Sequence, residues 1–249
     1  MSDILEFALN GHGGLPRWKE LAAVSAHLHQ GGALWELKEQ AGVLADVDVT
    51  ADLGDEHVSH GPFGDPPVRT RFSPDRVAIE SDDGAVLEEL LHPRDSFAGH
   101  IQTTAWNRLQ LAYFAGTAMW TYLTQPFSFT RPGFGISEGG PWTEAGKTYR
   151  RMNVTWPANL ATHNANQVVY LDEAGLIFRH DYTVEITGNT AAAHYMTEYV
   201  DVSGIQVPTR HRIYPRTADG QSDPSLLIVS IDYTDVRYTE RRSTGEQLG

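Results

Sequence analysis

Hydrophobic and polar residues alternate along much of the chain, and this period of two is typical of β-strands with one buried face. The clearest example is Gly42–Asp52, where valines and alanines alternate with Asp46, Asp48 and Thr50. The same alternation predicts further strands at Val24–Leu28, Ala33–Leu37, Val68–Phe72, Val77–Glu80, Tyr149–Trp156, Gln167–Leu171, Leu176–Ile186, Ala192–Val200, Ile205–Ile213 and Leu226–Tyr233. Turn residues connect many of these segments within a few positions, as at Asp172–Gly175. Short connections indicate antiparallel hairpins.

Helical patterns are few. Asp3–Leu9 can form a short amphipathic helix, and Pro16 suits the first turn of a second helix that runs through Leu21. A third helix is expected over residues 103–123, where apolar side chains occupy nearly every face. Such a helix needs burial on several sides, so we expect a mainly β (α+β) protein whose curled antiparallel sheet, an incomplete barrel, wraps around a buried central helix.

Residues 124–146 follow this helix and contain Pro126, Pro132, Pro141 and five glycines. A long segment of this composition inside a compact domain is usually a lid or a binding loop. We therefore expect a lid-like loop over 124–146 that crosses the mouth of any pocket beside the central helix.

Length and composition indicate one domain over residues 1–249, because all-β domains often reach this size and no repeat or linker divides the chain. The formal net charge of −13 disfavours nucleic acid as a partner, since phosphate backbones repel an acidic surface. The absence of cysteine excludes disulfides and thiolate metal sites. The apolar stretch 109–123 is shorter than the roughly 20 residues of a membrane span. Acidic Asp3 and Glu6 do not fit an export signal, so a cytoplasmic protein is expected, and its oligomeric state stays open.

The order of elements, short helices followed by antiparallel strands around a central helix, resembles the LolA-like fold. This fold encloses an apolar cavity, and it also occurs in a cofactor-independent enzyme of violacein biosynthesis. The segments NGHGGLPRW and ATHNANQVVYLDEAGLIFRHDY, the latter with its RHDY ending, resemble an uncharacterised bacterial family. Both resemblances imply a fold and neither implies an activity.

Several polar side chains fall on strand faces that are otherwise apolar. His180 and Tyr182 alternate in phase with Val184, and His211 shares its face with Ile213, so all three polar side chains are expected to point inward. The direction of His194 is ambiguous from its neighbours. Inward polar groups need hydrogen-bond partners. They either satisfy one another inside the core or border a ligand cavity, and the sequence leaves both possibilities open.

Aromatic residues supply candidate walls for such a cavity. Trp106, Tyr113 and Trp120 recur every seven residues and would form one stripe on the central helix. Trp156 and Phe178, on predicted strands, could face this stripe. The five residues are predicted to bind a lipophilic or aromatic molecule, although such a stripe is more often ordinary core.

These features predict a cofactor-independent enzyme of the lyase, cyclase or isomerase type that acts on a lipophilic small molecule. Its acid–base groups would be His180, Tyr182, His211 and His163. The alternative is a binding protein or carrier for a hydrophobic molecule or lipid. No serine lies in the strand–turn–helix setting that the nucleophile of an α/β-hydrolase requires, which excludes that class of enzyme.

A metal is not expected to be required. His57 and His60 lack the helical spacing that would align two imidazoles, and the scattered His92, His100 and His163 would have to converge in space. The best triad that can be drawn, His163 with His180 and His211, depends on three separate segments meeting in space. Neutral, hydrogen-bonded histidines explain the same pattern, so we expect neither a metal nor another cofactor.

Overall fold

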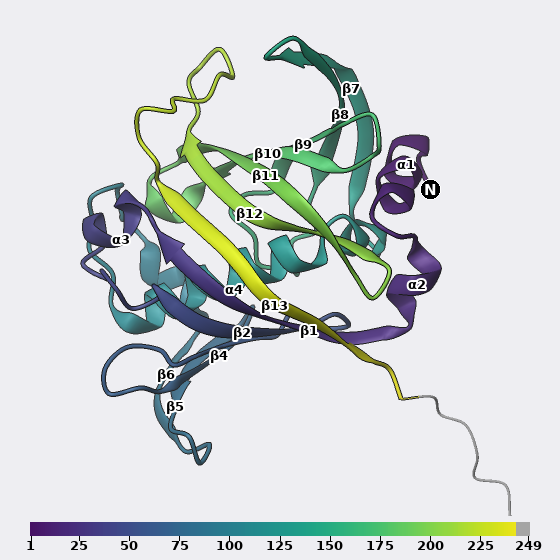
Figure 1. Cartoon of the computed structure of the whole chain (residues 1–249). Helices are drawn as coiled ribbons and strands as arrows, with labels where there is room; N and C mark the ends of the chain where they lie inside the picture. The colour runs from purple at the N-terminus through teal and green to yellow at the C-terminus, as the bar shows by residue number, and fades with distance from the viewer. Residues whose placement is uncertain (243–249) are drawn as a thin grey trace, which may run out of the picture.

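The computed structural model describes residues 1–242, which form one antiparallel sheet of 13 strands (Figure 1). The strand order is β6-β5-β4-β3-β2-β1-β13-β12-β11-β10-β9-β8-β7. The strands are β1 (Leu21–Gly31), β2 (Asp46–Asp52), β3 (Val58–Gly61), β4 (Arg69–Ser73), β5 (Arg76–Glu80), β6 (Val86–Leu91), β7 (Gly135–Glu144), β8 (Lys147–Thr155), β9 (Asn166–Leu171), β10 (Ile177–Val184), β11 (Thr190–Val202), β12 (Ile205–Pro215) and β13 (Val229–Glu240). The sheet is curled and unclosed, which confirms the predicted fold class.

Few helices accompany the sheet. They are α1 (Asp3–Gly11), α2 (Leu15–Lys19), α3 (Ala33–Leu37) and α4 (Arg108–Thr124), with short 3₁₀ turns η1 (Pro93–Phe97), η2 (Phe127–Thr130) and η3 (Glu185–Thr187). The helix α4 lies inside the curl and packs against β2–β6 (Figure 1). All of its side chains from Gln110 to Thr124 are buried. In the described residues no helix has the length and apolarity that crossing a membrane requires.

The central helix begins later than the predicted start at residue 103. Its N-cap is Asn107, whose side chain accepts a hydrogen bond from the Gln110 backbone, while the Gln110 side chain accepts one from the Asn107 backbone. This capping box satisfies two helix-terminal donors and sets the start at Arg108 rather than Thr103. Trp106 therefore precedes the helix, and the predicted seven-residue stripe keeps only Tyr113 and Trp120.

The structure also departs from the predictions at residues 33–37, at Gly42 and at Leu21. Residues 33–37, predicted as a strand, form α3 after Gly32, whose φ of 111° turns the chain out of β1. The strand predicted from Gly42 begins at Asp46, because residues 41–44 form a turn in which Gly42 has a φ of 77°. The second helix ends at Lys19, and Leu21 already belongs to β1.

The predicted lid-like loop over 124–146 is mostly regular structure. It forms η2 and then β7, which pairs with β8 and makes one edge of the sheet. Glycines and prolines are tolerated in an edge strand because one side of its backbone needs no partner strand. The expectation of a lid from this segment is therefore wrong.

Candidate ligand-binding cavity

A cavity of about 90 Å³ lies between α4 and the half of the sheet formed by β10–β13. The helix contributes Phe114, Ala115, Ala118, Met119 and Tyr122, and the strands contribute Tyr182, Val184, Thr190, Ala192, Ile213, Val229 and Ile231. The opposite side of α4 packs on β2–β6. The lining is largely apolar, as is usual for pockets that bind lipophilic molecules.

The mouth of the cavity is formed by α3 and the segment before β13. Leu37 and Leu226 border it and are 38% and 44% exposed. The buried Lys38, directly after α3, donates hydrogen bonds to the carbonyl oxygens of Gln102 (2.7 Å) and Thr104 (3.0 Å). Burial lowers the pKa of Lys38 to about 8. These bonds hold α3 over the entrance.

Two tyrosine hydroxyls stand at the inner wall. The Tyr122 and Tyr182 oxygens are 2.7 Å apart and hydrogen-bonded. Burial raises the pKa of both residues well above the ordinary value, so both hydroxyls stay neutral. This tyrosine pair is the polar feature at the inner wall of the cavity.

Four buried histidines lie behind the tyrosine pair. His211 Nε2 lies 3.1 Å from the Pro208 carbonyl and donates to it, so His211 Nδ1 accepts from His194 Nε2 at 2.8 Å. His180 Nε2 donates to the side-chain oxygen of Gln167 at 2.7 Å. The fourth, His163, has its Nε2 3.5 Å from the Tyr122 hydroxyl.

The environment keeps these histidines neutral. Burial lowers the pKa of His163, His180 and His211 to about 3 and that of His194 well below its ordinary value. The Nδ1 atoms of His180 and His194 have no hydrogen-bond partner among the described residues. In both rings Nε2 is therefore hydrogen-bonded, and Nδ1 can still accept a hydrogen bond.

The inward direction predicted for His180, Tyr182 and His211 is confirmed by their burial, at 1%, 3% and 0% exposure. Tyr182 borders the cavity, whereas His163, His180 and His211 are not among its lining residues. The structure adds Tyr122, Gln167 and His194 to the group. Pairing of His180 with His194 across β10 and β11 could not be predicted without the strand register.

None of the predicted aromatic residues lines this cavity. Tyr113 and Trp120 lie on the side of α4 that faces β2–β5, where Tyr113 packs on Phe72 and Trp120 donates hydrogen bonds to Asp52 and Asp55 carbonyls. Because α4 is apolar all round, its periodicity could not indicate which face meets the cavity. Trp106 packs in the core against Phe97, Phe114 and Lys38 instead.

Phe178 stacks on Tyr149 with ring centroids 4.2 Å apart, at a register irregularity between Ile177 and Arg179 that interrupts the alternation. Tyr113 and Trp156 instead border a second cleft of about 470 Å³, together with Arg94 and Glu185. Arg94 is already bound to Glu185 and to the Thr162 carbonyl.

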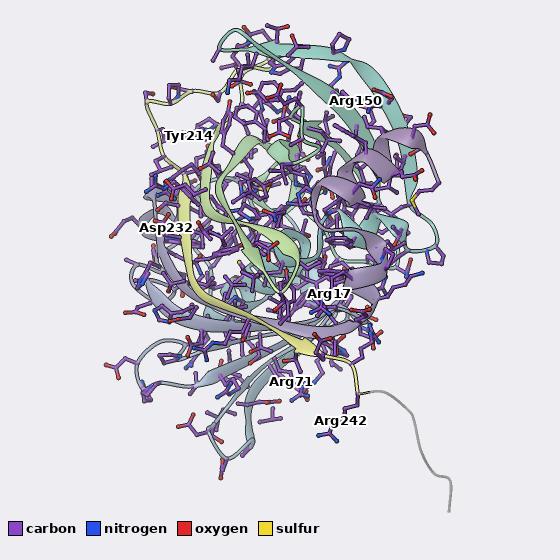
Figure 2. The ribbon with its side chains drawn as sticks, turned by 45° about the vertical axis from the view of Figure 1, so that its right-hand side comes forward. Arg17, Arg71, Arg150, Tyr214, Asp232 and Arg242 are labelled. Atoms are coloured by element: carbon purple, nitrogen blue, oxygen red, sulfur yellow. The ribbon has the colours of Figure 1, made fainter. Side chains whose placement is uncertain are left out.

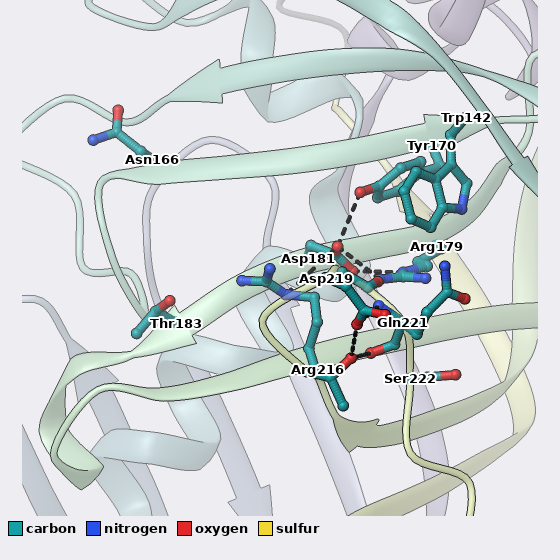
Figure 3. Close-up of polar contacts among 12 residues, drawn as sticks. Trp142, Asn166, Tyr170, Arg179, Asp181, Thr183, Arg216, Asp219, Gln221 and Ser222 are labelled. Atoms are coloured by element: carbon teal, nitrogen blue, oxygen red, sulfur yellow. Dashed lines mark hydrogen bonds and ion pairs between the residues drawn. The ribbon is translucent and has the colours of Figure 1, made fainter.

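A further polar cluster occupies the opposite face of β10 (Figure 3). Arg179 is fully buried, and its guanidinium donates to Asp181, Glu144, Tyr195 and the Gly220 carbonyl. Every guanidinium nitrogen has a partner, so the cluster fixes β7 and the β12–β13 connection to the sheet. Arg179 therefore has no free nitrogen to offer a ligand.

Among residues 1–242, one group of three side chains lies close enough together to bind a metal ion, and it consists of His27, His29 and Asp46. His163, His180 and His211, the triad drawn from the sequence, do not form such a group.

Neither a protein-family model nor a curated protein sequence matches the chain. Among solved structures, a LolA superfamily protein from Nitrosomonas europaea is similar with a TM-score of 0.52 and 10% identity, over 96% of this chain and 93% of that chain. A DUF1329 family protein from Desulfovibrio piger is similar with a TM-score of 0.46 and 9% identity, over 98% and 93% of the two chains. The chain therefore has a LolA-like fold, as its order of elements predicted.

Proposed function

We propose that the protein binds a lipophilic small molecule or lipid in the cavity between α4 and β10–β13. The observation that supports this proposal is a mainly apolar lining that includes the hydrogen-bonded pair formed by Tyr122 and Tyr182. An apolar group in this space would be removed from water, which contributes about 25 cal/mol per Å². The hydroxyls would contact a polar end of the ligand.

The size of the cavity constrains how a ligand enters. At about 90 Å³ it is smaller than the roughly 300–1,000 Å³ of typical ligand pockets. A larger molecule would have to extend out between Leu37 and Leu226 or displace α3. The hydrogen bonds of Lys38 to the Gln102 and Thr104 carbonyls hold α3 in place. An apolar chain with its far end at the mouth fits this shape.

An acid–base enzyme has less support from the same geometry. A proton-transfer group must reach the ligand, and the titratable residues that line the cavity are the neutral Tyr122 and Tyr182. The observation in favour of this second candidate is the free Nδ1 of His180 and of His194. In an enzyme, His180→Gln would abolish turnover and leave affinity intact, whereas a carrier has no turnover to lose.

Titration with a fluorescent apolar probe tests the proposal. Ala118→Phe adds a ring to the cavity wall and should lower probe affinity at least about tenfold, because the space for the ligand is filled. Met119→Leu changes the same wall at nearly constant volume and is the matched control. Equal affinity of the two folded variants, checked by thermal melting, would contradict binding in this cavity.

A further inference from the structure

Two histidines and two aspartates form a square on the outer face of β1 and β2. His27 and His29 are separated by buried Leu28, so both project from the same side of β1. In the antiparallel register His27 lies opposite Asp48 and His29 lies opposite Asp46. The four side chains therefore meet on the face of the sheet that points away from α4.

The contacts within the square already bring ligand atoms together. His27 Nε2 is 2.7 Å from Asp46 Oδ1, and His27 Nδ1 is 2.8 Å from Asp48 Oδ1. The His27 and His29 rings have centroids 4.7 Å apart. One ligand atom from each of His27, His29 and Asp46 lies within 4.8 Å of the others. Zinc ligands at about 2.0–2.2 Å need separations near 3.4 Å, so small side-chain rotations suffice.

The geometry points to a divalent transition-metal site formed by His27, His29 and Asp46, and we propose that it binds Zn²⁺ or a similar ion. Two imidazoles and one carboxylate suit Zn²⁺, Cu²⁺ and Ni²⁺, whereas Ca²⁺ and Mg²⁺ prefer oxygen ligands. Asp48 holds His27 Nδ1 and so directs Nε2 toward Asp46, which is the usual role of a carboxylate behind a metal-bound histidine. Asp46 and His29 are exposed, and water can complete the coordination.

Charged groups around the proposed metal site affect which residues can bind the ion. Asp232 on β13 lies opposite His29, but its carboxylate is bound to Arg212 at 2.9 and 3.0 Å. It is therefore not offered as a fourth ligand. Hydrogen bonds that His27 donates to Asp48 and Asp46 raise its pKa, so a metal must displace a proton there. The net charge of −13 favours cations near the protein.

Calorimetric titration with Zn²⁺ alone tests the site, using protein without an affinity tag, treated with chelator, at mildly alkaline pH. We expect saturable, stoichiometric binding that weakens about 10–100-fold in His29→Gln and in Asp46→Asn. His57→Gln removes an exposed histidine elsewhere and should leave affinity unchanged. With Cu²⁺, electron paramagnetic resonance should show two coordinated nitrogens, and one in His29→Gln.

Absence of saturable binding would overturn the proposal, as would equal affinity in His29→Gln and His57→Gln. The substituted residues His29, Asp46 and His57 are exposed, so thermal melting should be nearly the same in all variants without metal. The outcome is independent of whether the apolar cavity binds a lipophilic molecule, because the site lies on the other face of the sheet.

Discussion

Six buried polar side chains near the cavity are hydrogen-bonded in three pairs. His194 donates to His211, His180 donates to Gln167, and Tyr122 is bonded to Tyr182. Removal of one member of such a pair leaves the other without a partner, which costs more than loss of the bond itself. This pairing agrees with the interpretation that inward histidines satisfy one another in the core, and it leaves the tyrosine pair to meet a ligand.

Tyr182→Phe should lower the free energy of unfolding by about 1–2 kcal/mol, because the Tyr122 hydroxyl then loses its 2.7 Å partner. The double variant Tyr122→Phe with Tyr182→Phe should cost less than the sum of the single changes, since it leaves no orphaned hydroxyl. Urea unfolding of the four proteins measures this coupling. Strictly additive costs would mean that the two hydroxyls do not interact.

At the scale of elements, the alternation of residues predicted most strands because a sheet with one buried face preserves a period of two. In β2 the pattern is complete, with Val47, Val49 and Ala51 buried and the residues between them exposed. Alternation did not predict the local structure correctly where contacts elsewhere in the fold determine it. Residues 33–37 form a helix because Gly32 turns the chain, and the buried helix α4 carries no periodicity that shows which face borders the cavity.

The cross-strand groups were harder to predict for a related reason. The square of His27, His29, Asp46 and Asp48 depends on the register between β1 and β2, and the pairing of histidines depends on that between β10, β11 and β12. Each strand can be predicted from its own residues, but register requires the partner strand. The alternating His-Leu-His and Asp-Val-Asp segments were the signal available in the sequence.

Packing of α4 on β4 depends on Gly116. A Cβ at this position would overlap the ring of Phe72, so Gly116→Ala should destabilise the protein by about 1–3 kcal/mol. In a helix interior with free space, replacing glycine by alanine stabilises the helix by about 1 kcal/mol. The sign of the change in unfolding free energy therefore shows whether Phe72 restricts this position. Chemical denaturation provides the measurement. Combination with Phe72→Leu should recover part of the loss, and a stabilised Gly116→Ala would contradict this packing.

At the scale of the molecule, the buried histidines couple folding to pH. Burial lowers the pKa of His12 and His60 to about 4 and that of His163, His180 and His211 to about 3, from an ordinary value of 6.5. Below pH 6.5 the unfolded chain takes up protons that the folded chain does not bind. Stability from these groups is therefore complete above pH 6.5 and is lost as pH falls toward their folded pKa values.

We expect the free energy of unfolding to fall by several kcal/mol between neutral pH and about pH 5, since each such histidine contributes about 1.4 kcal/mol per pH unit. Glu56 acts in the opposite direction, because burial raises its pKa to about 8 and its stabilisation is lost as pH rises from 4.5. The effect of this one carboxyl on the free energy of unfolding is smaller than the combined effect of the five histidines. Denaturation curves measured across this interval check the slope, and a flat profile would contradict neutral burial of the histidines.

The central claim is that a lipophilic molecule occupies the space between α4 and β10–β13. A crystal structure with a bromine-labelled apolar ligand tests it most directly, because anomalous scattering locates the bromine without reference to the protein. The account predicts a bromine peak among Ala118, Met119, Ile213 and Ile231, with the polar end of the ligand near the tyrosine pair or at the mouth. A peak only in the second cleft beside Tyr113, or only on the surface, would contradict it.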